Sequence, residues 1–241
     1  MKKTTSLMIL IAGLLLAGAS PSAAQTPLAG KLFINVSGGG QMSTDTLSTG
    51  NALTIYNQTA TWTATENIDR GGLFDISVGY KVWNNLGLQV GFSRFTNSGA
   101  AAGIAVVPSP IFFNRPNTVT LDLSTTERSD RNVYIAAVWF VPVMDKIDLA
   151  ISIGPSFTKV KQQLVTDITI PAGTSNAVPF LATQSATAKG VNIGVDGTYL
   201  FLKWLGAGAF VRYNGGSVDL DQVADVKAGG LQLGIGARLR F

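Results

Sequence analysis

The 241-residue chain contains no histidine and no cysteine, so several kinds of catalytic chemistry have no residue to perform them. Histidine is the most common general base, and its absence excludes every His-dependent triad and zinc site. The absence of cysteine excludes disulfides, thiolate metal sites and a lipid-modified N-terminal cysteine. Carboxylate pairs remain possible in principle.

Two segments still carry residue types associated with such chemistry. Asp219, Asp221 and Asp225 lie close together, and paired carboxylates can act as acid and base. At this spacing in a polar loop, they are more typical of solvation or weak cation contacts. The segment 38–40, Gly-Gly-Gly, lacks a following helix and a Gly-Lys-Ser/Thr sequence, so it indicates strand flexibility or a kink rather than a phosphate loop. We expect no catalytic residue, no metal and no cofactor.

The N-terminus has the pattern of a secretory signal peptide. Lys2 and Lys3 form a basic start, residues 7–18 are an uncharged apolar run, and small residues precede a cleavage point after residue 24. A membrane anchor is the alternative, but about 12 apolar residues are too few to cross ~30 Å of hydrocarbon as a helix. We expect residues 1–24 to be a signal peptide and residues 25–241 to form one all-β domain.

The net charge gives little support for a nucleic-acid partner. Lys2 and Lys3 account for two of the 18 basic residues, so 16 remain against 14 acidic residues, a net charge of about +2. This excess is too small to indicate nucleic-acid binding.

Apolar and polar residues alternate with a period of two through eight segments, whereas a helical period is hard to find. The pattern is clearest at the end of the chain, where apolar residues alternate with glycine, glutamine and arginine. One segment is apolar on both faces, and we take Val133, Ile135, Ala137 and Trp139 as its outer set. The eight predicted strands cover residues 31–40, 72–83, 86–95, 131–142, 147–154, 189–202, 205–214 and 231–241.

The connections between these strands alternate between short and long. The short ones fall at residues 84–85, 144–146 and 203–204. The long ones cover about 44–70, 96–130, 161–187 and 215–226 and are rich in Thr, Ser, Asn and Gly. Within the first, residues 54–65 are strand-like and could extend a hairpin above a membrane. Short turns at one end and long loops at the other are typical of transmembrane barrels.

The polar face decides which side of the barrel meets solvent. A soluble lipocalin-like barrel also alternates, but its water-facing surface would carry many Lys and Glu residues. Here the polar face consists mainly of Gly, Ser, Asn and Gln, and small residues suit the interior of a narrow eight-stranded barrel. The few charges of both signs would pair inside the lumen. The charged residues that we expect in the lumen are Asp75, Lys81, Asp148, Asp196, Arg212, Arg238 and Arg240.

Tryptophan placement supports the same orientation. Trp83, Trp139 and Trp204 each lie beside one of the three short turns, so they would share one membrane interface. An indole ring suits that interface because the ring is apolar while its N–H stays hydrated. We expect these residues to form an interfacial aromatic belt.

With these features, the mature chain resembles the small eight-stranded outer-membrane barrels of Gram-negative bacteria, the OmpA/OmpX/OmpW-like group. The sharpest motif is the C-terminal strand, where Gly236, Leu239 and Phe241 resemble the Gly-x-x-apolar-x-aromatic signal of barrel assembly. The polar residue usual upstream of that glycine is not evident at Leu233 or Gly234, so recognition would rest on Leu239 and Phe241. An ordinary final strand is the alternative.

The resemblance implies an all-β, eight-stranded antiparallel transmembrane up-and-down β-barrel with short periplasmic turns and long extracellular loops. It implies a place in the cell outer membrane, with outer-membrane lipids, lipopolysaccharide and the barrel-assembly machinery as partners. It names no extracellular partner. The lipid A deacylases, palmitoyl transferases, phospholipases and omptin-type proteases of this class resemble one another in needing a histidine near the catalytic Ser or Asp. This chain has none.

One predicted loop, residues 101–116, is apolar and rich in proline. We expect it to fold over the barrel mouth as a packed cap; an entry site for a small apolar ligand, or a patch against lipid or a partner, is the alternative. Its apolar residues are Val106, Val107, Ile111, Phe112 and Phe113.

Together these observations favour a non-enzymatic outer-membrane protein with a structural or surface-interaction role. The alternative is a small channel or transporter for small, possibly hydrophobic, solutes. Eight strands leave too little space for a wide aqueous pore, because Arg and Asp side chains would fill the lumen.

Overall fold

The computed structural model describes residues 31–42, 45–55, 57–109, 112, 115–121, 123, 125–171 and 177–241. The predicted signal peptide lies outside the described residues. No helix in the described part of the chain is long and apolar enough to cross a membrane.

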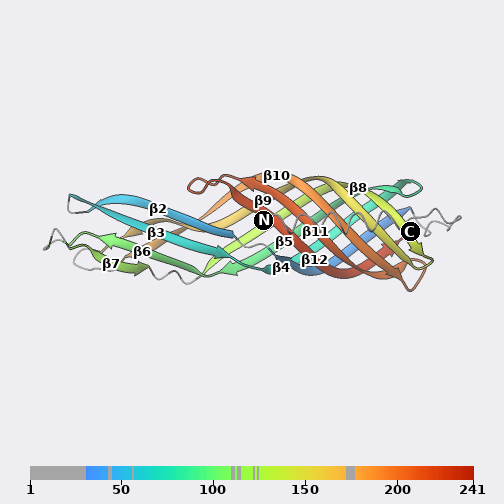
Figure 1. Ribbon diagram of the computed structural model, residues 1–241, viewed down its shortest axis with the longest axis horizontal. Coiled ribbons are helices and arrows are strands. Elements are labelled where there is room, and N and C mark those ends of the chain that lie inside the picture. The colour runs from blue at the N-terminus through green and yellow to red at the C-terminus, as the bar shows by residue number, and fades with distance from the viewer. Residues whose placement is uncertain are drawn as a thin grey trace, which may run out of the picture.

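Eight antiparallel strands close into a barrel, which confirms the predicted fold class (Figure 1). Their order around the ring is β1-β12-β11-β10-β9-β8-β5-β4, and β1 closes the ring by pairing with both β12 and β4. The strands are β1 (Leu32–Met42), β4 (Gly71–Trp83), β5 (Leu86–Gly99), β8 (Thr126–Met144), β9 (Ile147–Thr169), β10 (Val178–Leu200), β11 (Leu205–Val218) and β12 (Val226–Arg240).

The outer surface of the barrel is apolar and its inner surface is polar. Along β8, Val133, Ile135 and Trp139 are exposed, while Asn132 and Tyr134 between them are buried. The same alternation runs along the neighbouring strands, so the apolar side chains form a continuous belt around the barrel. An apolar belt of this kind meets lipid rather than water. Further belt residues are Phe74, Ile76, Val78, Leu88, Val90, Phe92, Ile151, Ile153, Phe157, Val191, Ile193, Val195, Val211 and Ile235.

Three short turns lie at one end of the barrel, which we call the turn end. They join β4 to β5 through Asn84 and Asn85, β8 to β9 through Asp145 and Lys146, and β10 to β11 through residues 201–204. Asn84 has a positive φ of 28°, a conformation that Asn tolerates better than most residues because its short side chain can hydrogen-bond locally.

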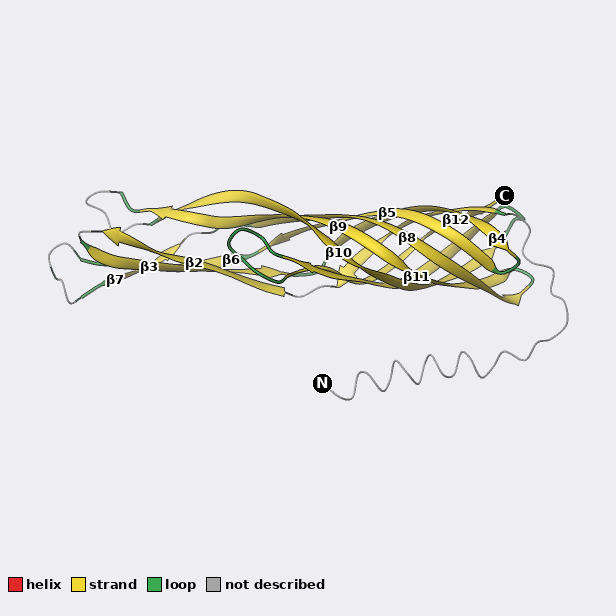
Figure 2. Ribbon diagram, turned by 90° about the horizontal axis from the view of Figure 1, so that it is seen from above, coloured by secondary structure: helices red, strands yellow, loops and turns green. Residues whose placement is uncertain are grey.

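Most of the segments predicted as long loops are strands. A separate four-stranded sheet, in the order β2-β3-β6-β7, lies beyond the other end of the barrel, which we call the distal end (Figures 1 and 2). Its strands are β2 (Asp45–Ile55), β3 (Gln58–Ile68), β6 (Ala101–Val107) and β7 (Asn117–Leu121). The connections predicted as long loops over about 44–70, 96–130 and 161–187 are therefore largely strands, because β8, β9 and β10 also continue into this region. The strand-like segment 54–65 lies in the hairpin of β2 and β3, as the sequence indicated.

The distal sheet folds because it buries an apolar face against the outer parts of β9 and β10. On β3, Ala60, Trp62 and Ala64 are buried, while Thr61 and Thr63 are exposed. In this extension, apolar side chains thus point inward and hydroxyls outward, the reverse of the barrel. The buried cluster comprises Trp62, Ala64, Ala105, Val107, Leu121, Leu123, Val165, Ile168 and Ala177.

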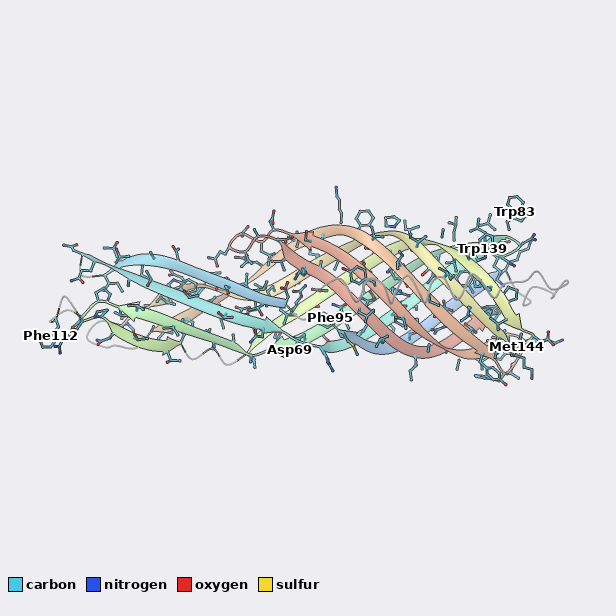
Figure 3. All side chains as sticks on the ribbon, in the orientation of Figure 1. Asp69, Trp83, Phe95, Phe112, Trp139 and Met144 are labelled. Carbon is cyan, nitrogen blue, oxygen red and sulfur yellow. The ribbon has the colours of Figure 1, made fainter. Side chains whose placement is uncertain are left out.

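This arrangement corrects the prediction of a mouth loop over residues 101–116. Val106 and Val107 belong to β6 and point to opposite faces of the distal sheet, with Val107 in its core. Phe112 is exposed at the far tip of the extension (Figure 3). Ile111 and Phe113 lie outside the described residues. The apolar residues of 101–107 are therefore explained by pairing with β3 and β7 rather than by a cap on the barrel.

Because the belt faces lipid, a charge introduced there should destabilise the protein more than a charge on the water-facing extension. Val90→Arg places a cation in the middle of the belt and should lower the free energy of unfolding by about 2–4 kcal/mol. Ser185→Arg, on the exposed face of β10 in the extension, should change it by less than about 0.5 kcal/mol. Urea unfolding of both variants, folded in phospholipid vesicles, measures the difference. Equal costs at the two positions would contradict the assignment of the belt to lipid.

Candidate functional site

Charged side chains fill the interior of the barrel from the turn end upward. Arg240 donates hydrogen bonds to Asn35 Oδ1 at 2.9 Å and to Thr198 Oγ1 at 3.2 Å. Asp148 is buried in the same layer and interacts electrostatically with both Arg240 and Lys81. Strands β1, β4, β9, β10 and β12 thus each supply one polar group to a single cross-section of the lumen.

Aromatic rings occupy the rest of the lower and middle lumen. Phe33 meets Phe140 edge to face, with ring centres 5.2 Å apart. Two glycines make room for such rings: a Cβ at Gly79 would lie 2.1 Å from Phe33 Cζ, and one at Gly91 would lie 2.1 Å from Tyr134 Cζ. These inward glycines therefore allow large rings to close the barrel core.

A bidentate ion pair forms the next layer. Arg238 donates through Nε and Nη2 to the two carboxylate oxygens of Asp196, at 3.0 and 2.6 Å, and through Nη1 to Ser37 Oγ at 2.8 Å. The Arg238 side chain is fully buried. A forked, charge-assisted contact of this kind is strong and fixes the relative position of β10 and β12.

A second buried ion pair crosses the middle of the lumen. Arg212 Nη1 lies 2.6 Å from Asp75 Oδ2, and the Tyr134 hydroxyl donates to the same oxygen at 3.1 Å. The Arg212 guanidinium also stacks over the rings of Tyr134 and Phe210, 4.4 and 4.7 Å from their centres. Removing one partner of a buried pair commonly costs about 3–5 kcal/mol, so this contact resists opening.

The upper lumen is closed by a third pair and by amides. Arg128 binds both oxygens of Asp130 at 3.0 Å and donates to the Lys227 carbonyl at 2.5 Å. Beside it, Gln232 donates to Gln41 at 2.9 Å across the β1–β12 seam.

A very small cavity lies in the middle of the barrel interior. A cavity between Phe33, Phe140, Arg212 and Arg240 has a volume of about 20 Å³. This is enough for one or two water molecules and not for a file of them. The ion-pair layers therefore close the lumen to aqueous solutes in this conformation.

The distal mouth is covered as well. Leu220, in the β11–β12 connection, and Val226, at the start of β12, pack with Leu47, Ile68 and Leu164. Within the same connection, Asp219 Oδ1 accepts a hydrogen bond from the Asp225 amide at 2.8 Å, and this contact closes the turn. The described part of the chain contains no group of three or more acidic side chains that could hold a metal ion.

Glu66 is a buried ionisable residue that the sequence analysis did not single out. It lies on β3 between the distal sheet and the upper barrel, its side chain is buried, and it accepts a hydrogen bond from Gln162 at 3.1 Å. Burial raises the pKa of Glu66 from 4.5 to about 7, although hydrogen bonds from the Val165 amide, Gln162 and Thr126 oppose the rise. The alternation of side chains along β3 could place Glu66 on the inner face of the strand. Its burial, however, depends on the packing of β3 against β9, which the sequence does not show.

The other residues singled out from the sequence lie in separate places. Trp83, Trp139 and Trp204 are exposed, and Figure 3 shows the first two at the turn end. Leu239 and Phe241 lie on the outer face of the last strand and its end, where the Phe241 amide and carbonyl pair with Leu32. The backbone links the two groups at the turn end, where the Arg240 amide donates a hydrogen bond to the Trp204 carbonyl at 2.9 Å.

No protein-family model and no curated protein matches the sequence. Solved structures match in fold. The outer membrane protein OprG from Pseudomonas aeruginosa is 10% identical; the match covers 91% of this chain and 99% of that chain, with a TM-score of 0.52. Neisserial surface protein A is 14% identical over 87% of this chain and 97% of that one, with a TM-score of 0.49.

The outer membrane protease OmpT from Escherichia coli also matches, at 10% identity over 92% of this chain and 100% of that chain, with a TM-score of 0.46. The closed eight-stranded ring and the similarity to OprG show that the chain has the fold of a small outer-membrane β-barrel. At these identities, the similarity shows the fold alone.

The buried carboxyl predicts a pH dependence of the extension. Because the folded-state pKa of Glu66 is raised above its ordinary value, the stability it contributes is complete below pH 4.5 and is lost as the pH rises through about 7. Glu66→Gln keeps an acceptor for Gln162 without the charge. It should stabilise the extension by about 1–2 kcal/mol at pH 8 and leave it unchanged at pH 4.

Hydrogen exchange of β3 amides, compared between the variant and the wild type at the same pH, measures this effect. Glu127→Gln, an exposed change of the same chemistry on β8, is the control and should have no effect at either pH. Slower exchange in Glu66→Gln at pH 4 as well as at pH 8 would contradict a role for ionisation.

Proposed function

We propose that the chain is a non-enzymatic outer-membrane β-barrel with a structural or surface-interaction role, and that the distal sheet is its interaction surface. The observation that carries the proposal is the contrast between a closed lumen and a folded extension. The lumen is filled by the Arg238–Asp196 and Arg212–Asp75 pairs. The extension instead has its own apolar core and presents hydroxyl-rich strands to solvent.

Several features support this orientation and location. The turn end carries exposed tryptophans next to short connections, which suits the periplasmic interface. The distal end carries the large folded extension, which suits the cell exterior. Residues 1–24 would serve as an export signal removed from the mature protein, and Gly236, Leu239 and Phe241 would serve as the assembly signal. An enzymatic role is disfavoured because the chain has no histidine to activate a nucleophile.

Labelling of intact cells tests the orientation. The chain has no cysteine, so a single Thr63→Cys on the exposed face of β3 reacts alone. A maleimide coupled to a large polymer, which cannot cross the outer membrane, should label Thr63→Cys in intact cells. It should label Asp145→Cys, in the β8–β9 turn, only after the outer membrane is permeabilised. Labelling of Asp145→Cys alone in intact cells would overturn the proposal.

Transport of small, possibly hydrophobic, solutes is the second candidate. It is favoured by a hollow of about 260 Å³ in the barrel wall below the distal end. The hollow is bordered by belt residues such as Met42 and Tyr213, by the luminal Arg128, and by Gly229 and Gly230, which have positive φ. The ion-pair layers block the lumen below this hollow. A solute that entered the hollow could therefore continue only laterally, through the barrel wall into the membrane.

Conductance in planar bilayers separates an aqueous channel from the surface role. Because ion pairs fill the lumen, we expect no stable open steps from the wild-type protein, while a large water-filled barrel inserted by the same procedure serves as the positive control. Stable open steps that disappear when Asp196 or Arg212 is replaced by a bulkier residue would favour transport instead.

A further inference from the structure

Three basic residues stand side by side on the outer face of the barrel. In the register of the strands, Arg94 on β5 is opposite Arg131 on β8, and Arg131 is opposite Lys159 on β9. All three side chains are exposed. Directly paired residues on neighbouring antiparallel strands are about 4.5–5.5 Å apart at Cα, so three positive charges form an unbroken row.

The row marks the edge of the apolar belt. One step toward the turn end, the corresponding positions are Phe92, Val133 and Phe157, all exposed and apolar. Lys189 on β10 is opposite Phe157, and Lys161 lies one outward position above Lys159. We call Arg94, Arg131, Lys159, Lys161 and Lys189 the basic patch.

No ion pair in the described part of the chain neutralises the patch. Like charges directly opposite each other destabilise a sheet. Within the described residues, the ion pairs shorter than 4.0 Å involve Arg128, Arg212, Lys227 and Arg238, and none involves a member of the patch. The neighbouring Asp130 points inward to Arg128, and Glu127 lies two outward positions above Arg131.

A polar hollow lies directly above the row. It has a volume of about 500 Å³ and includes Arg94 and Lys161 in its lining. Most of the remaining lining consists of hydroxyl and amide side chains, and Glu127 is the acidic member. Such a lining suits a hydrated, sugar-like group with hydroxyls to donate and accept hydrogen bonds.

The patch occupies one side of the barrel only. On β4 the residue opposite Arg94 is Phe74, and on β11 the residue opposite Lys189 is Ser217. Lys227 on β12, opposite Ser217, is also exposed, but it pairs with Asp45 at 3.6 Å. Uniform attraction to an anionic membrane surface would place basic residues around the whole rim. Within the described residues, the adjacent basic residues that form no ion pair lie on β5, β8, β9 and β10, and this grouping indicates a discrete site.

We propose that the basic patch binds the phosphate groups of a phosphorylated glycolipid of the outer leaflet, the lipid A part of lipopolysaccharide. Arginine and lysine bind phosphate through charge-assisted hydrogen bonds, and basic clusters at a membrane boundary bind anionic headgroups. The acyl chains lie against Phe92, Val133 and Phe157, the phosphates against the row, and the sugar in the hollow above. This site rests on the proposed placement in an outer membrane.

Calorimetric titration of the folded full chain tests the site. The protein is held in micelles of an uncharged detergent, and lipid A with two phosphates is the titrant. The triple variant R94Q/R131Q/K159Q should bind at least tenfold more weakly than the wild type. The matched control R115Q/K146Q/K203Q removes the same charge from exposed positions elsewhere and should bind as the wild type does. Heat-modifiable migration in electrophoresis verifies that each variant is folded.

Other titrants separate the sources of phosphate. Lipid A without phosphates should bind at least tenfold more weakly, and millimolar inorganic phosphate should not displace the phosphorylated lipid. Displacement by inorganic phosphate, or equal binding of a soluble sulfated polysaccharide, would overturn the lipid assignment. Equal affinity of the triple variant and the control would overturn the site.

A single substitution tests the site if the triple variant does not fold. R131Q alone changes the centre of the row and should weaken binding of the two-phosphate lipid severalfold. Unchanged affinity in R131Q would contradict the inference. The surface role is tested separately, because labelling of Thr63→Cys in intact cells does not depend on lipid A binding.

Discussion

One constraint governs the whole structure: its long strands run continuously from lipid into water, so the same strand must suit both solvents. On β9, Ile153 and Phe157 face outward in the belt, and Lys159 and Lys161 face outward just beyond it. The inward face changes in the opposite sense, from hydroxyls in the barrel to Val160 and Leu164. Apolar side chains next to lipid need no core behind them, whereas a segment in water must bury its apolar side chains inside.

This change of solvent explains why the molecule has two kinds of interior. In the barrel, the apolar side chains lie on the outer surface, so the narrow interior contains mainly polar side chains. These buried groups must hydrogen-bond or ion-pair with one another. The result is the series of pairs Arg240–Asn35, Arg238–Asp196, Arg212–Asp75 and Arg128–Asp130, interleaved with aromatic rings. Above the membrane, the distal sheet and the β9–β10 ribbon form an ordinary two-layer core around Trp62 (Figure 2). Glu66 lies where these two interiors meet.

The sequence predicted the barrel well because lipid-facing rows are strongly apolar and the period of two is easy to recognise. Even the ambiguous segment 131–142 was assigned the outer set that the structure exposes. Of the distal sheet, the sequence indicated only the strand-like segment 54–65. The buried row of the sheet contains small residues: Ala60 and Ala64 alternate with threonines, and Ala105 lies between the apolar Ile104 and Val106. That contrast is weak, and the pairing of β3 with β6 joins segments far apart in the chain. The partners of Arg212 and Arg238 are likewise invisible in one sequence, because they depend on the register around the closed ring.

The most direct measurement is the environment of a spin label along the outward face of β9. Single cysteines at Ile153, Phe157, Lys161 and Asp167, in a chain with no other cysteine, report collisions with oxygen, which is enriched in lipid, and with a water-soluble nickel chelate. We predict that oxygen dominates at Ile153 and Phe157 and that the nickel chelate dominates at Lys161 and Asp167. Nickel accessibility at Ile153 and Phe157 equal to that at Lys161 and Asp167 would contradict the exchange of lipid for water along this strand.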